Sequence, residues 1–163
     1  MRTKRTLQNR PRARAAARIE VQFACEARGL PSARRLQALA RAAAAGGAQI
    51  TLRIVGAAEG RRLNSAFRGR DYATNVLAFD YRAPRGGARR VAQGDIVLCH
   101  PVLLREARAQ RKLLADHYAH VVVHGVLHLR GYAHRRAAEA ARMERSEARI
   151  LRHFGIADPY LVR

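Results

Sequence analysis

The histidines between residues 124 and 134 constrain this chain more than any other feature of its sequence. His124 and His128 are four residues apart, so on one helix their rings would project from the same face about 6 Å apart, close enough to share a metal ion. On a straight helix His134 would lie about 15 Å beyond His124 and point away. Gly131 precedes it, and a left-handed glycine ends a helix and lets the chain fold back. The spacing predicts a three-histidine site with one open coordination position.

A second interpretation of this pattern needs no metal. His124 and His128 could be ordinary residues on a buried helix face, with Gly131 as a simple C-cap. We favour the metal site, because the two histidines, the glycine and His134 all agree with it. Zinc suits three imidazoles and a water molecule, although nitrogen ligands alone also suit nickel or copper.

The identity of the ligands indicates the chemistry of such a site. Three neutral imidazoles leave the double positive charge of the metal uncompensated, which suits an activated water molecule and an anionic phosphodiester. Zinc peptidases place a glutamate directly after the first histidine as the general base, whereas this chain has Gly125 there. The pattern favours phosphodiester hydrolysis, and a metallopeptidase is the weaker alternative.

The charge of the chain points in the same direction. The sequence holds 32 Lys and Arg against 12 Asp and Glu, a formal net charge of +20 over 163 residues, which predicts attraction to a polyanion such as nucleic acid. Residues 1–18 contain basic residues and no acid, so we expect a flexible basic arm, with a misassigned start or a leader peptide as alternatives. Residues 19–163 are expected to form a single domain.

Hydrophobic periodicity predicts an α+β fold with a small mixed sheet of about four strands packed with helices, and a metal site at the end of a long helix in the C-terminal half. A basic loop is expected over residues 82–93. The expected strands cover residues 19–23, 50–54, 75–81 and 95–100, and the expected helices cover residues 32–45, 58–67, 102–109, 115–130 and 135–154.

The run from His124 to His134 resembles the signature of the YbeY family of metal-dependent endoribonucleases, except at Ala133, where the family has aspartate. A second block from Leu63 to Phe79 resembles the other hallmark of that family, and the likeness extends over residues 19–160. The resemblance implies a zincin-like fold, one Zn²⁺ on His124, His128 and His134, and single-stranded RNA as the substrate. It also implies a role in maturing the 3′ end of small-subunit (16S) ribosomal RNA and in ribosome quality control.

The resemblance also suggests which further residues act. The invariant arginine of the family maps onto Arg68, whose guanidinium could grip a phosphate and stabilise charge that develops on it. His124 and Arg68 are therefore the expected catalytic residues. The residues expected to bind RNA are Arg68, Arg70, Arg82, Arg85, Arg89 and Arg90.

Three residues could support the metal ligands from behind: His120, Asp95 and Glu147. Each also has a simpler explanation: His120 as a partly buried helix histidine, Asp95 as the start of a strand, and Glu147 as a partner of a basic group. Ala133 can neither orient a histidine nor accept a proton, so the cleavage rate is in question, and the nucleophile is either water or the RNA 2′-hydroxyl.

The sequence thus predicts a cytoplasmic, zinc-dependent endoribonuclease that works with ribosomal RNA, the small ribosomal subunit and its assembly factors, and does not bind a membrane. The rival hypothesis is an RNA-binding ribosome-assembly factor with a structural zinc and little cleavage. Cys25 and Cys99 are expected to be free thiols.

Overall fold

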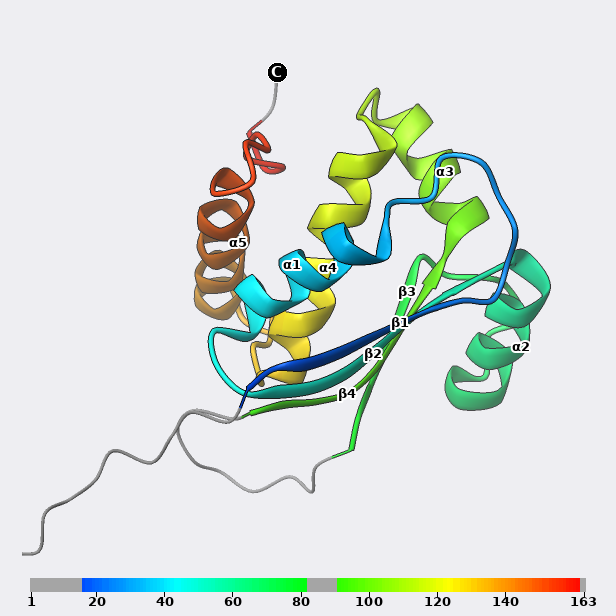
Figure 1. The fold of residues 1–163 in the computed structure, drawn as a ribbon, viewed down its shortest axis with the longest axis horizontal. Helices are drawn as coiled ribbons and strands as arrows, with labels where there is room; N and C mark the ends of the chain where they lie inside the picture. Colours follow the sequence, from blue (N-terminus) through cyan, green and yellow to red (C-terminus); the bar gives the residue numbers. More distant parts are fainter. Residues whose placement is uncertain (1–15, 82–90, 162–163) are drawn as a thin grey trace, which may run out of the picture.

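A computed structural model describes residues 16–81 and 91–161 (Figure 1). Its centre is a four-stranded mixed sheet with the strand order β1-β2-β4-β3. The three strands β1 (Arg18–Phe23), β2 (Ala48–Val55) and β4 (Ala92–Cys99) are parallel, and β3 (Val76–Asp80) runs antiparallel to β4 at one edge. Within the described residues the sheet carries five helices, which confirms the expected α+β class.

The helices are divided between the two faces of the sheet. The larger core lies between the sheet and α1 (Ala33–Ala44), α4 (Leu114–Leu129) and α5 (Ala137–Arg152). A smaller cluster, which includes Leu77 and Val97, lies on the opposite face beneath α2 (Ala57–Arg68). The helix α3 (His100–Ala109) follows directly from β4 and packs against α4. In Figure 1, α2 and α4 accordingly lie on either side of the paired strands β3 and β4.

The helix α4 is the central element for function, because it is apolar around most of its circumference. Tyr118, Val122 and Val126 are completely buried, as expected for a helix packed between the sheet and the helices α1, α3 and α5. Gly125 faces β4 so closely that an added Cβ would stand 3.1 Å from Ile96 Cγ2. The absence of a side chain at Gly125 thus allows α4 to lie directly on the sheet.

The expected elements are confirmed, with small shifts at their ends. The fourth strand begins at Ala92, three residues before the expected start, because Ala92 is fully buried and pairs with Ala48 of β2. Arg18, assigned to the arm from sequence, is the first residue of β1. The rest of the arm up to residue 15 and the basic loop over residues 82–90 lie outside the described residues. Among the helices of the described chain, none has the length and apolar character needed to cross a membrane.

Candidate metal centre

The C-terminal end of α4 turns the chain back as the sequence predicts. Gly131 has a φ of 90°, in the left-handed region, and its N–H donates to His128 O at 2.9 Å. The N–H of Tyr132 donates to Leu127 O at 3.0 Å. These two bonds form a Schellman motif, in which a glycine just beyond the helix satisfies its last carbonyl groups. The chain that leaves this turn carries His134 back toward the helix.

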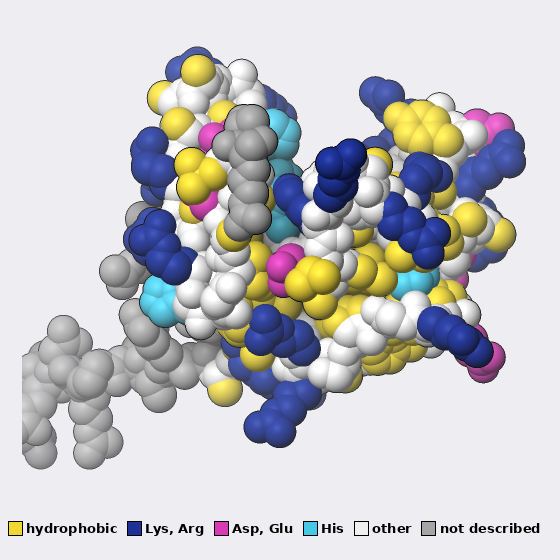
Figure 2. Space-filling view, turned by 90° about the horizontal axis from the view of Figure 1, so that it is seen from above, with side chains coloured by type: hydrophobic (Ala, Val, Ile, Leu, Met, Phe, Trp, Pro, Cys, Tyr) yellow, Lys and Arg dark blue, Asp and Glu magenta, His cyan; other side chains and the backbone are white. Residues whose placement is uncertain are grey.

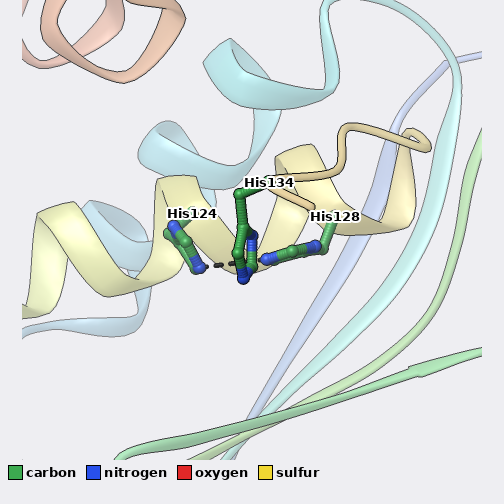
Figure 3. Close-up of side chains that lie close together, drawn as sticks. All are labelled: His124, His128 and His134. Carbon is green, nitrogen blue, oxygen red and sulfur yellow. Dashed lines mark hydrogen bonds between the residues drawn. The ribbon is translucent and has the colours of Figure 1, made fainter. Parts of the chain in front are cut away.

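Three imidazoles meet at this turn, His124 and His128 from α4 and His134 from the returning chain (Figure 3). The Nε2 atoms of His124 and His128 are 3.0 Å apart, and one ring nitrogen from each of the three residues lies within 4.8 Å of the others. His124 and His128 are half-buried, whereas His134 is exposed. The cluster therefore has a protein side and a side that opens to solvent.

A buried carboxylate supports the cluster from behind. Glu147 of α5 is completely buried, and its Oε1 lies 2.5 Å from Nδ1 of His124. The Tyr160 hydroxyl donates to Oε2, which is also 3.6 Å from Nε2 of His120. Burial raises the pKa of Glu147, but hydrogen bonds from His120, His124 and Tyr160 outweigh it and hold the pKa at about 2. The ionised carboxylate accepts the Nδ1–H of His124, which leaves the Nε2 lone pair facing the other histidines.

His128 is held in the neutral form that binds metals. Burial, followed by the nearby charges of His124 and His134, lowers its pKa to about 4. The negative charge of Glu147 and, to a smaller extent, a hydrogen bond with the backbone of Tyr132 oppose this shift. At neutral pH the imidazole of His128 is therefore unprotonated and offers a lone pair.

The donor set fits a zinc ion. Tetrahedral zinc with Zn–N distances of about 2.0–2.1 Å needs ligand nitrogens about 3.3 Å apart. The separations in the cluster, 3.0 Å between the two Nε2 atoms and at most 4.8 Å overall, are close to this requirement. Three imidazoles, one of them oriented by a carboxylate, also match the ligand chemistry of catalytic zinc sites.

Comparison with known proteins decides the family. The family model described as Endoribonuclease YbeY matches residues 30–155. The chain belongs to the YbeY family of endoribonucleases. This confirms the family and the nuclease assignment expected from the sequence.

Individual relatives carry the same name. The Endoribonuclease YbeY of Bordetella pertussis is 63% identical over 115 residues, which cover 71% of each chain. The Bordetella avium protein of that name is 53% identical over 154 residues, or 88% of this chain and 93% of its own. A Thermotoga maritima protein solved in solution is 22% identical, with a TM-score of 0.55 over 87% of this chain and 99% of its own. The last likeness shows a shared fold.

Of the other two residues that were expected to support the metal ligands in this YbeY-family chain, one lies near the histidine cluster and one does not. His120 lies beside Glu147 and 3.2 Å from the Tyr160 hydroxyl, one turn of α4 before His124. Asp95 does not reach the histidines: it lies two residues before Val97 and therefore on the same face of β4, the one toward α2, and it accepts a hydrogen bond from Tyr81. Asp95 thus lies on the face opposite α4, where it cannot support the metal ligands.

Of the candidate arginines, the structure describes two, Arg68 and Arg70. Arg68 is the exposed last residue of α2 and makes no hydrogen bond to the three imidazoles, and Arg70 donates to the Tyr72 hydroxyl at 3.1 Å. The other four fall outside the described residues: Arg82, Arg85, Arg89 and Arg90.

Two arginine side chains pack on the turn that leads to His134. The guanidinium carbons of Arg130 and Arg142 lie 5.5 and 5.3 Å from the centre of the Tyr132 ring. Nη1 of Arg130 also donates to Ala43 O at 3.0 Å. Ala133 follows with only a methyl group, so the carboxylate that supports this site comes from Glu147 on α5.

One supporting residue was missed from the sequence. Tyr160 belongs to the closing segment of the family resemblance, but no role was assigned to it. Its hydroxyl contacts Glu147 across the turn after α5, and a lone tyrosine near the end of a chain carries no spacing that predicts such a contact.

The peptidase alternative finds no support. The position where zinc peptidases have their glutamate is Gly125, which is buried against Ile96 on the face of α4 that packs on the sheet.

Proposed function

We propose that this chain is a zinc-dependent endoribonuclease that cleaves single-stranded RNA at the His124–His128–His134 cluster. The observation that carries this proposal is the convergence of three imidazoles, one of them oriented by the buried carboxylate of Glu147. Such a cluster is built to hold a metal, and in an endoribonuclease family its solvent-open side is the place where a phosphodiester can approach.

The residues of the site divide the work. Zinc bound by the three histidines supplies the Lewis acidity that polarises a phosphate oxygen and activates water. Glu147 orients His124 and does not accept a proton from substrate, because it is fully buried and is held ionised by its three donors. His128, neutral at physiological pH, keeps its lone pair available without a proton to displace.

Arginine side chains supply the affinity for RNA. Arg68 binds the scissile phosphate and stabilises the charge that develops on it. Arg70 and the arginines of residues 82–90 contact the RNA backbone without regard to base sequence. Lys and Arg side chains are spread over the face shown in Figure 2, which agrees with this electrostatic role.

The biological substrate we propose is the 3′ end of 16S ribosomal RNA, which the enzyme matures in the cytoplasm together with the small ribosomal subunit and its assembly factors. The same activity serves ribosome quality control. We also propose a zincin-like architecture for the domain. In support of it, the long helix α4 carries two of the proposed zinc ligands, and a glycine turn after the helix leads to the third.

The test combines metal content with cleavage. His134→Ala removes an exposed ligand and leaves no cavity in the core, and His128→Ala removes a half-buried one. Both variants are expected to lose zinc, measured by elemental analysis, and to lose cleavage of a single-stranded ribosomal RNA precursor. The matched control is His153→Ala, which removes an exposed histidine at the end of α5. Full cleavage by metal-free His134→Ala protein would end this proposal.

A second function, an RNA-binding assembly factor with a structural zinc, is favoured by one observation. Ala133 replaces the family aspartate, and Glu147, the carboxylate that reaches the cluster, is committed to His120, His124 and Tyr160. Purified protein that binds the RNA precursor tightly but shows no chelator-sensitive cleavage would support this function over the first.

A further inference from the structure

We propose that Phe67, with Tyr72 and Arg70, forms a base-stacking subsite for single-stranded RNA beside Arg68, where α2 ends. The inference rests on the proposed function, because it assumes that the substrate is RNA. It adds the residues that hold a base of that strand, which the histidine cluster and Arg68 do not provide.

The first observation is the exposure of two aromatic side chains. Phe67 is 66% exposed and Tyr72 is 52% exposed, although burying a ring of this size would stabilise the fold by about 2 kcal/mol. The Phe67 ring contacts the ring of Phe79, with the centroids 5.0 Å apart and the planes at 69°. This edge-to-face contact fixes the orientation of the Phe67 ring while most of its surface stays open.

The second observation is the positive charge beside these rings that no carboxylate of the described residues balances. Arg61 is committed to Asp71 through two bonds of 2.7 Å. Arg68 and Arg70 form no ion pair with any carboxylate of the described residues, and Arg70 donates instead to the Tyr72 hydroxyl at 3.1 Å.

The third observation is the position of this surface relative to the histidine cluster. Phe79 belongs to β3, the edge strand, and packs with Leu77 toward α2. The alternate residues Val76 and Ala78 pack into the larger core, and α4 contacts β3 from that side. The aromatic surface and the helix that carries the histidines therefore lie on the two faces of one edge strand. An RNA strand that crosses this edge can touch both.

Single-stranded RNA is the occupant that this chemistry selects. Unstacked bases bind to aromatic faces and guanidinium planes, while neighbouring arginines neutralise the phosphates. In a duplex the bases are stacked on one another and cannot cover Phe67. The subsite thus predicts a preference for single strands that does not depend on the metal.

Binding of a fluorescent 2′-O-methyl RNA single strand by the full-length protein tests the subsite by anisotropy. Phe67→Leu keeps an apolar side chain but removes the ring, and it is expected to weaken binding about 5- to 100-fold. The control Phe23→Leu removes a 44% exposed ring from β1, at the opposite edge of the sheet, and should change binding less than about twofold. Thermal melting checks that both variants are folded.

Two further measurements separate stacking from charge. On the same strand with abasic residues, Phe67→Leu and the wild type should bind equally, because no base remains to stack. In a salt series, Phe67→Leu should keep the wild-type slope of the logarithm of the binding constant against the logarithm of the salt concentration. Arg70→Gln should make this negative slope shallower by about 0.7.

The outcomes distinguish this inference from the proposed function. Wild-type protein that neither binds nor cleaves RNA refutes the proposed function. Wild-type protein that does both, but whose affinity responds to Phe67→Leu no more than to Phe23→Leu, overturns the stacking subsite alone. The stacking subsite is also overturned if Phe67→Leu weakens binding to the abasic strand by the same factor as binding to the normal strand.

Discussion

Replacing Glu147 by glutamine tests the central claim about the metal centre. The side chain keeps its shape and one acceptor oxygen, so the completely buried position stays filled. Its negative charge disappears, and the bond of 2.5 Å to His124 Nδ1 changes from a charge-assisted hydrogen bond to a neutral one. Charge-assisted hydrogen bonds are about twice as strong as neutral ones. His124 should therefore be less firmly oriented and a weaker zinc ligand.

The expected loss follows from the general effect of such supporting groups. Removing the carboxylate behind a metal-binding histidine typically costs about 10- to 100-fold in metal affinity, or about 1.4–2.8 kcal/mol. We expect the zinc dissociation constant of Glu147→Gln to rise by this factor, measured by competition with a chromophoric chelator. The absorption spectrum of cobalt-loaded protein should shift as well, because the ligand field at His124 changes.

A matched control separates this effect from loss of charge alone. Glu144→Gln removes the same charge from an exposed position on α5, one turn before Glu147, and should leave the zinc dissociation constant within about twofold of the wild type. If Glu147→Gln lowered the melting temperature but bound zinc like the wild type, the carboxylate would serve only the fold, and the orientation argument would be refuted.

Three further predictions concern the fold around the site. A Cβ at Gly94 would stand 2.0 Å from Phe79 O, so Gly94→Ala should break the β3–β4 pairing and lower the unfolding free energy by about 3 kcal/mol or more, measured in urea. Gly125→Glu should prevent folding, seen as loss of the far-ultraviolet circular dichroism of the native protein, because it forces an unpaired charge against Ile96. Because the pKa of His128 falls from 6.5 to about 4 on folding, the folded apoprotein binds fewer protons than the unfolded chain between these values. Its unfolding free energy should thus decrease by up to about 3 kcal/mol as the pH drops from 6.5 to 4, measured by urea denaturation at a series of pH values. If the unfolding free energy of the wild type depended on pH no more steeply than that of His128→Asn, this prediction would be wrong.

The sequence alone determined the features that depend on neighbouring residues. The histidine spacing and Gly131 predicted the turn that brings three imidazoles together, because a helix and its glycine cap are governed by hydrogen bonds only a few residues long. Alternating and helical hydrophobic patterns predicted the α+β class for the same reason. The charge of +20 indicated a polyanionic partner without any knowledge of the fold.

Tertiary structure decided which distant side chains meet. The bond from His124 to Glu147 joins residues 23 apart on two helices, and Tyr160 completes it from the end of the chain. Asp95, an equally plausible supporting carboxylate in the sequence, falls on the opposite face of the sheet because side chains alternate along β4. Local pattern fixes the direction of a side chain within its own element, but its partner depends on how the elements pack. This is why the cluster of three histidines could be predicted from their spacing, whereas the sequence could name Glu147 only as one of three residues that might lie behind it, and the packing of α5 on α4 decided between them.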